Sequence, residues 1–191
     1  NPPFNDEFEG EAGVDVKFGI TNNLTADFTY NTDFAQVEVD ERQVNLTRFN
    51  LFFPEKREFF LEGAANFDFT QPRNLDVPTM FFSRRIGLEK GEIVPINVGG
   101  RVTGKIGDFD IGVLNIGTDG SELDGIQSTD FSVLRIKRDV LRRSRIGMMF
   151  TDRSDSAIGN GSNQLYGFDP AFKLYYDSLK QKTPRIWGLM L

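Results

Sequence analysis

Residues 98–113 read VGGRVTGKIGDFDIGV, and this stretch decides the fold class. Apolar residues or glycine occupy every second position from its start to Ile106, with polar residues or a further glycine between them. Such period-two alternation is typical of a strand with one buried face. Gly107-Asp108 suits a tight turn, after which the alternation resumes. The stretch nearly spells a phosphate-binding loop, but no Ser or Thr follows Lys105, so we interpret it as a β-hairpin.

The same alternation recurs along the chain and predicts an all-β, antiparallel protein. Short turns are expected at residues 21–23 and 139–144, and no window with a helical period exceeds about two turns. We expect about eight or nine strands of roughly 9–11 residues, the length that a tilted strand needs to cross a bilayer. The further alternating segments are residues 14–20, 24–34, 131–138, 145–151 and 166–176, with a last strand expected at 184–191.

The composition excludes several classes of protein. The 191 residues include no Cys and no His, which removes His-based catalytic triads, thiol nucleophiles, disulfide frameworks and metal sites with His or Cys ligands. A net charge of −6 argues against a nucleic-acid partner. No apolar run is long enough for a transmembrane helix, whereas a transmembrane β-barrel is compatible with alternating strands.

A charged run in the middle of the chain interrupts the strands. Residues 55–62 read EKREFFLE, and residues 54–94 as a whole resemble an irregular loop that folds inward. We predict an ion-pair network in a barrel lumen or plug, with a recognition or gating loop as the alternative. The residues of this predicted network are Glu55, Lys56, Arg57, Glu58, Glu62, Arg84 and Arg85.

Two further charged groups have open interpretations. Asp33, Glu38 and Asp40 form a candidate cation or polar-ligand site, with Ca²⁺ as the hard cation that carboxylates would hold. A carboxylate pair among them could also hydrolyse glycosides, or they could line a water-filled lumen. The basic residues at 135–138 and 142–145 suit lipopolysaccharide phosphates or anionic lipid, or a solvated turn. No catalytic residue is assigned.

Several long motifs resemble a family of bacterial outer-membrane proteins of unassigned function. They are GITNNLTADFTYNTDFAQVEVD at 19–40, QVNLTRF at 43–49, FFPEKREFFLEG at 52–63, FSRRIG at 82–87 and GGRVTGK at 99–105. The resemblance implies a β-barrel domain that follows a sugar-binding domain similar to carbohydrate-binding family 9. It also implies that the sugar-binding domain precedes residue 1 and that further strands follow residue 191. Some relatives are labelled hydrolases, but no catalytic residues carry over.

From these observations we expect residues 1–191 to form the N-terminal portion of an outer-membrane β-barrel domain. Strands are expected at about 13–53 and 95–191, in an antiparallel up-and-down transmembrane barrel, with the plug region at about 54–94. Short turns alternating with longer loops favour this architecture.

The expected role is passage or binding of a polar solute, glycan-derived by analogy with the family, or a structural or assembly role in the Gram-negative envelope. The expected partners are outer-membrane lipid, lipopolysaccharide and other envelope proteins, and no cofactor besides the candidate Ca²⁺ is expected. Enzymatic activity is not favoured. The alternatives are a soluble extracellular carbohydrate-binding β-sandwich and a glycoside hydrolase that uses two carboxylates.

Overall fold

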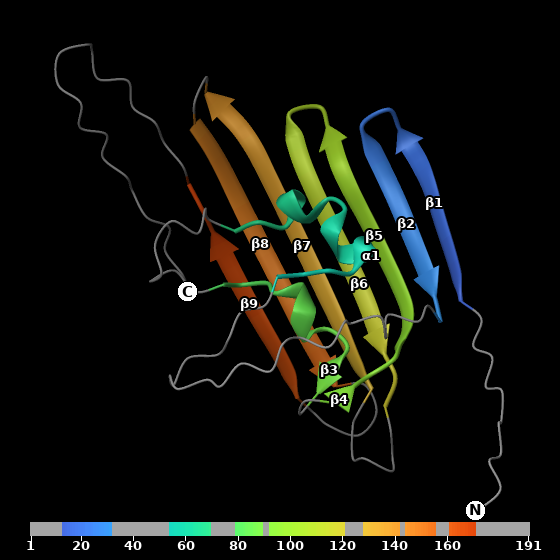
Figure 1. Ribbon diagram of the computed structural model, residues 1–191. Helices are drawn as coiled ribbons and strands as arrows, with labels where there is room; N and C mark the ends of the chain where they lie inside the picture. Colours follow the sequence, from blue (N-terminus) through green and yellow to red (C-terminus); the bar gives the residue numbers. More distant parts are fainter. Residues whose placement is uncertain are drawn as a thin grey trace, which may run out of the picture.

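The fold is one antiparallel sheet with a small layer on one of its faces (Figure 1). The computed structural model describes residues 13–31, 54–69, 79–89, 92–120, 128–141, 144–155 and 161–170. The seven strands of the sheet follow the order β1-β2-β5-β6-β7-β8-β9, so each strand pairs with the next one of the sheet along the chain. Their bounds are β1 Val14–Thr21, β2 Leu24–Tyr30, β5 Ile96–Ile106, β6 Phe109–Thr118, β7 Thr129–Leu141, β8 Ser144–Asp155 and β9 Ser162–Phe168. The prediction of an all-β, antiparallel, up-and-down sheet is confirmed; the described sheet is open, with β1 and β9 at its edges.

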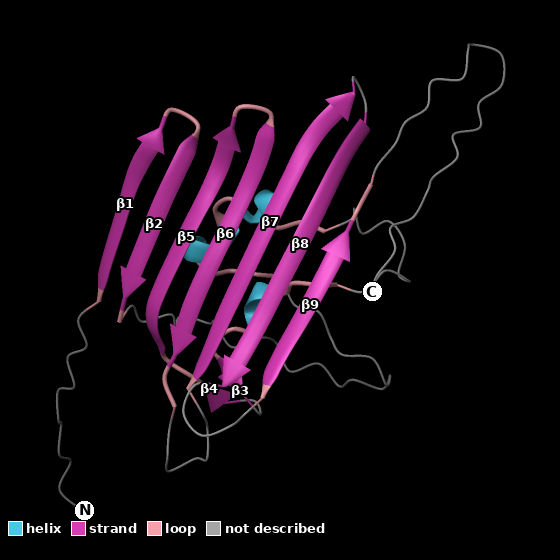
Figure 2. Cartoon of the chain, turned by 180° about the vertical axis from the view of Figure 1, so that it is seen from behind, coloured by secondary structure: helices cyan, strands magenta, loops and turns pink. Residues whose placement is uncertain are grey.

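The chain between β2 and β5 supplies the second layer. We call its described residues 54–69 and 79–89 the inner segment. It contains α1 (Glu58–Leu61), the 3-10 turns η1 (Ala64–Asn66) and η2 (Ser83–Arg85), and β3 (Leu88–Glu89), which pairs with β4 (Glu92–Ile93). Figure 2 shows the sheet from behind, with these elements on its far side and no described segment crossing the near side. No helix in the described ranges is long and apolar enough to span a membrane.

Several strand bounds differ from the predicted ones. β7 and β8 pair as far as Leu141 and Ser144, so their connection is shorter than the predicted turn at 139–144. The last described strand is β9, Ser162–Phe168, rather than a strand over residues 166–176. The alternation does not reveal where β9 begins, because its first residues, 162–164, are all polar and pair with the polar end of β8. β2 ends at Tyr30 instead of continuing to residue 34, and Asn31 takes a positive φ of 47°. The strand expected at 184–191 lies outside the described residues.

The two faces of the sheet differ in polarity. We call the face under the inner segment the covered face and the opposite one the open face. The covered face carries buried charged side chains, including Asp27, Arg101 and Arg135. The open face carries exposed apolar side chains over all seven strands, among them Val16, Phe28, Val98, Val113, Leu134, Met148 and Tyr166.

The apolar core lies between the covered face and the inner segment. Two glycines on the covered face allow this close approach. A Cβ on Gly112 would lie 3.0 Å from the ring of Phe67, and one on Gly167 would overlap the sulfur of Met80. Glycine at these two positions therefore makes room for side chains of the inner segment. The buried apolar residues of the core are Phe60, Phe67, Met80, Ile86, Ile96, Leu114, Ile116, Val133 and Met149.

Candidate functional site

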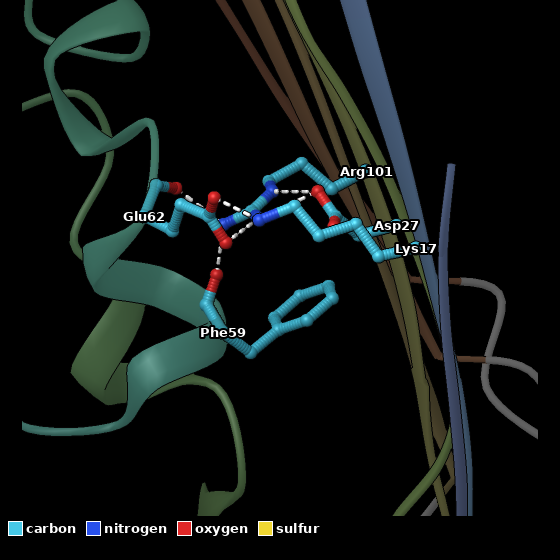
Figure 3. A network of polar contacts seen from close by, with 5 residues as sticks. All are labelled: Lys17, Asp27, Phe59, Glu62 and Arg101. Carbon is cyan, nitrogen blue, oxygen red and sulfur yellow. Dashed lines mark hydrogen bonds and ion pairs between the residues drawn. The ribbon is translucent and has the colours of Figure 1, made fainter. Parts of the chain in front are cut away.

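A buried arginine of the sheet binds the end of α1. Arg101 on β5 donates from Nε and Nη2 to Oδ2 of Asp27 on β2, at 3.1 and 2.6 Å. Its Nη1 donates to the carbonyl oxygens of Phe59 and Glu62, and its guanidinium lies 5.0 Å from the centre of the Phe59 ring (Figure 3). The Arg101 side chain is 2% exposed, so one cation joins two strands and the helix terminus away from water.

The same group extends to the edge of the sheet. Lys17 on β1 forms an ion pair with Glu62, and both side chains are about half exposed (Figure 3). The hydrogen bond from Lys17 holds the pKa of the Glu62 carboxyl below its usual range, and the nearby Arg101 acts in the same direction. We call Lys17, Asp27, Glu62 and Arg101, with the carbonyl of Phe59, the sheet-to-segment network. It connects β1, β2 and β5 to the inner segment.

A second network lies within the inner segment. Arg57 binds both carboxylate oxygens of Glu55 at 2.9 Å and donates to the carbonyls of Ser83 and Ile86 at 2.8 Å. The Ser83 hydroxyl donates to Glu55 at 2.6 Å, and the Arg57 guanidinium lies 4.2 Å from the centre of the Phe60 ring. We call this group the intra-segment network. It holds together two parts of the inner segment that are nearly 30 residues apart in the chain.

The Glu55 carboxylate is held in its charged form by this network. Burial by itself raises the pKa of the Glu55 carboxyl, but the hydrogen bonds from Arg57 and Ser83 outweigh it and leave the pKa below its usual value. Arg84 adds a further link, because its Nη1 donates to the Pro54 carbonyl at 2.5 Å. The charges here therefore maintain the shape of the inner segment.

β7 supplies a third set of contacts. Arg135 binds both carboxylate oxygens of Asp169 at 2.8 and 2.5 Å, and its Nε donates to the Asp68 carbonyl at 3.1 Å. Lys137 donates to the Ala65 carbonyl at 2.8 Å. Arg135 is 1% exposed and its guanidinium lies 5.1 Å from the centre of the Phe69 ring. Cations of the sheet thus bind backbone carbonyls of the inner segment at two separate places, on β5 and on β7.

The structure divides the predicted charge network into separate groups. Glu55 and Arg57 pair with each other, and Arg84 binds the Pro54 carbonyl close by, whereas Glu62 belongs to the sheet-to-segment network. Lys56 contributes its backbone N–H to Glu55. Glu58 and Arg85 are exposed, at the start of α1 and the end of η2.

Sequence reasoning missed the residues of the sheet that hold the inner segment. The sequence pattern does not single out Asp27, Arg101 or Asp169, and it places Arg135 and Lys137 in a basic cluster that suits lipid phosphates or a solvated turn. The structure places Arg135 and Lys137 on the covered face, buried against the inner segment. The sequence does contain one indication of this placement. Asp27, Arg101, Arg135 and Lys137 alternate with apolar residues or glycine along their strands, so their side chains point to the face opposite the apolar ones.

The predicted cation site and the other acidic groups can be compared with the described residues. Asp33, Glu38 and Asp40 lie outside the described residues, and within the described ranges no three Asp or Glu side chains gather in a way that could hold a metal ion. The hollow lined by Glu55, Lys56, Arg57, Arg84 and Leu88 is small, and its Glu55 and Arg57 already bind each other. Among the described residues, the carboxylates of Asp27, Glu55 and Asp169 each bind an arginine, so these three carboxylates serve to position the inner segment or to hold its shape.

Comparisons with known proteins give one family match. The model of the family described as domain of unknown function (DUF5916) matches residues 3–99, just over half of the chain, and the chain belongs to this family. No curated protein and no solved structure matches the chain. The outer-membrane and sugar-binding associations of the resemblance described above stay predictions.

Proposed function

We propose that this chain forms part of the wall of an outer-membrane β-barrel whose polar interior, partly filled by the inner segment, binds or passes a polar solute. The observation that carries the proposal is the polarity of the two faces of the sheet. Buried charges lie on the covered face and exposed apolar side chains on the open face. A water-soluble sheet with one covered face exposes polar side chains on its other face, whereas here the exposed face is apolar and the covered face carries buried charges beside its apolar core.

The open face suits lipid because its apolar residues are continuous across the sheet. One cross-strand row runs through all seven strands and contains only apolar residues. An exposed apolar surface of this width is rare in soluble monomers, whereas the outer surface of a membrane barrel requires it. The members of the row are Phe18, Ala26, Val102, Val113, Leu134, Phe150 and Tyr166.

Strand lengths and connections support the same proposal. β5 to β8 contain 10 to 13 residues each, enough for tilted strands to cross a hydrocarbon core. At one end of the sheet β1–β2 and β5–β6 are joined by two-residue turns, and at the other end the connections span residues 31–95, 119–128 and 156–161. Outer-membrane barrels have short periplasmic turns and longer outer loops, which orients the short turns toward the periplasm.

The interior supports a role with polar solutes. The inner segment covers the middle of the sheet and is held by Arg101, Arg135 and Lys137, so the lumen beside it is narrowed and lined by charge. The edges β1 and β9 need pairing partners in lipid, because unpaired backbone groups are costly there, so further strands of the full protein would complete the wall. A glycan-derived solute is an analogy with the domain that precedes the barrel in the resembling family.

The test is membrane extraction of the full-length protein. We expect that it leaves the membrane fraction only with detergent, and that its gel mobility changes on boiling, as closed barrels show. Release into detergent-free buffer with unchanged mobility would contradict the proposal and favour the soluble β-sandwich, in which a second sheet would cover the open face.

A matched pair of variants locates the lipid contact. Val102→Arg places a charge in the middle of the apolar row and is expected to destabilise the membrane form by about 2–4 kcal/mol. Ser154→Arg, on the same face but between the polar cross-strand neighbours Asp130 and Ser162, is expected to assemble normally. The amount of heat-modifiable protein in membranes measures both, and equal assembly of the two variants would count against lipid on this face.

A further inference from the structure

We propose that the membrane boundary crosses the sheet obliquely, so that hydrogen-bonded rows of the open face begin in the lipid hydrocarbon at β1 and end in the polar headgroup layer at β9. The inference rests on the proposed function and adds to it the position and direction of the lipid contact. Two independent features of the sheet support it, one at each of its ends.

The first feature is the polarity of two rows near the end with the longer connections. One row is Val14, Tyr30, Val98, Gly117, Asp130, Ser154 and Ser162. The neighbouring row is Val16, Phe28, Gly100, Asn115, Ser132, Asp152 and Gln164. Both rows carry apolar side chains on the β1 side, as far as β2 or β5, and polar side chains on β7 to β9.

The change from apolar to polar side chains within one row is explained if the surroundings of the open face change from hydrocarbon to headgroups along that row. On the same face, the next two rows toward the short turns stay apolar from β1 or β2 through β9. The apolar surface therefore reaches at least two rows further on β1 and β2 than on β7 to β9. A planar boundary between hydrocarbon and headgroups produces this pattern when the strands are inclined to the membrane normal.

The polar side chains on β7 to β9 fit a headgroup layer. Asn115 donates to the Ser132 hydroxyl at 2.9 Å, and the Tyr166 hydroxyl donates to Gln164 at 2.9 Å. Amide and hydroxyl groups such as these suit the polar headgroups of lipids and would be costly in hydrocarbon.

The second feature is the stagger of the short turns at the opposite end. β5 continues two residues beyond Gly104, which pairs with the first residue of β2. β7 continues three residues beyond Arg138, which pairs with the first residue of β6. From β1–β2 to β7–β8 the turns advance by about five residues, about 17 Å, over four strand spacings of about 4.8 Å. This corresponds to an inclination of about 40°, within the tilt range of closed barrels.

The two features agree in direction. Going from β1 to β9, the short turns advance away from the end with the longer connections, and the polar border advances the same way. Phe28 and Gln164 share a row but would differ in depth by about 15 Å at this inclination. This pair of residues therefore distinguishes an oblique boundary from one parallel to the rows.

The experiment measures the depth of single tryptophans in lipid vesicles. Trp187, the one tryptophan of residues 1–191, and any tryptophan elsewhere in the full-length protein are replaced by Phe, and Phe28→Trp, Gln164→Trp or Phe150→Trp is then introduced. The vesicles contain lipids brominated on their acyl chains. We expect Phe28→Trp and Phe150→Trp to lose roughly half or more of their fluorescence and Gln164→Trp to lose little, because hydrocarbon surrounds only the first two positions. Heat-dependent gel mobility identifies the variants that fold.

The other outcomes are decisive as well. Equal quenching of Phe28→Trp and Gln164→Trp, with Phe150→Trp also quenched, would overturn the oblique boundary while leaving the barrel proposal intact. Absence of quenching at all three positions would overturn both, because the central apolar row would then not contact lipid.

Discussion

In both the sheet-to-segment network and the intra-segment network, one arginine binds a carboxylate and two backbone carbonyls. The two networks differ in which parts of the molecule they connect. Arg101 joins Asp27 of the sheet to two carbonyls of α1, whereas Arg57 joins Glu55 to two carbonyls near η2 in the same segment. The first network therefore fixes where the inner segment lies, and the second fixes its internal shape. Loss of the first should free the segment from β5, and loss of the second should loosen the segment while it stays attached.

The largest effect is expected from Arg101→Met. This change leaves the Asp27 carboxylate, 9% exposed, without its cation, and we expect the free energy of unfolding to fall by about 3–5 kcal/mol. Urea unfolding of the full-length protein, followed by heat-dependent gel mobility, measures the loss. Lys105→Met is the control, because Lys105 lies on the same strand and face but is exposed, and a change within about 0.5 kcal/mol is expected. Equal midpoints for the two variants would contradict the role of Arg101.

Arg57→Met is expected to have the next largest effect, about 1–3 kcal/mol. It removes both guanidinium hydrogen bonds to Glu55, which keeps the Ser83 hydroxyl and the backbone N–H groups of residues 56 and 57, and it removes the donor from two carbonyls, all within the inner segment. The same urea titration measures the change. A loss as large as that of Arg101→Met would mean that the two networks are not separable in this way.

Disulfide trapping sharpens the distinction between position and shape. The chain has no native Cys, and a Cβ on Gly112 of β6 would lie 3.3 Å from the Cβ of Asn66 in η1, near the about 3.5–4.5 Å of a disulfide. We expect the pair Asn66→Cys and Gly112→Cys to cross-link readily. Addition of Arg101→Met should lower the yield, while addition of Arg57→Met should leave it nearly unchanged.

Acid is expected to weaken both networks by a smaller, graded amount. The carboxyl pKa values of Glu55 and Glu62 lie below their ordinary 4.5 in the folded protein. Their stabilising contribution is therefore complete above pH 4.5 and is lost as the pH falls through the folded-state values. The urea midpoint should drop on this acid side, and Glu55→Gln should flatten the drop. A midpoint that rises on acidification would contradict this assignment.

The smallest effect is expected from Lys17→Gln. The Lys17–Glu62 pair is about half exposed, so we expect a loss below about 1 kcal/mol that disappears at high salt. The comparison is with Arg101→Met, whose effect should persist in salt because the Arg101–Asp27 pair is buried. A salt-independent loss at Lys17 would show that this pair is also shielded from solvent.

The sequence was most informative where structure depends on neighbours in the chain. Alternation and the Gly107-Asp108 turn predicted the β5–β6 hairpin, which the structure confirms. The charge run pointed to ion pairs in this region without choosing among partners, and the Glu55–Arg57 pair lies within it, two residues apart. Arg101 and Asp27 are 74 residues apart, so no local sequence pattern connects them. They meet because β2 and β5 are neighbours in the sheet although the inner segment lies between them in the chain.

The close approach of the inner segment was equally hidden. Gly112 and Gly167 follow the alternation as small residues, and only the packing of Phe67 and Met80 against them shows that a side chain would be crowded at Gly112 and would overlap a neighbour at Gly167. The candidate site at Asp33, Glu38 and Asp40 lies outside the described residues and stays a prediction.

The pairing of β2 with β5 has a consequence for the order of folding. This pairing closes a loop of about 65 residues, whereas β5 to β9 form by short connections between neighbours. Local hairpins form faster than contacts between distant parts of a chain. The β5–β9 meander is therefore expected to form first, and the β1–β2 hairpin to join it afterwards. The Arg101–Asp27 pair joins β5 to β2, so it can form only in this last step. Arg101 also binds the inner segment, so that segment is expected to reach its final position only when β2 pairs with β5.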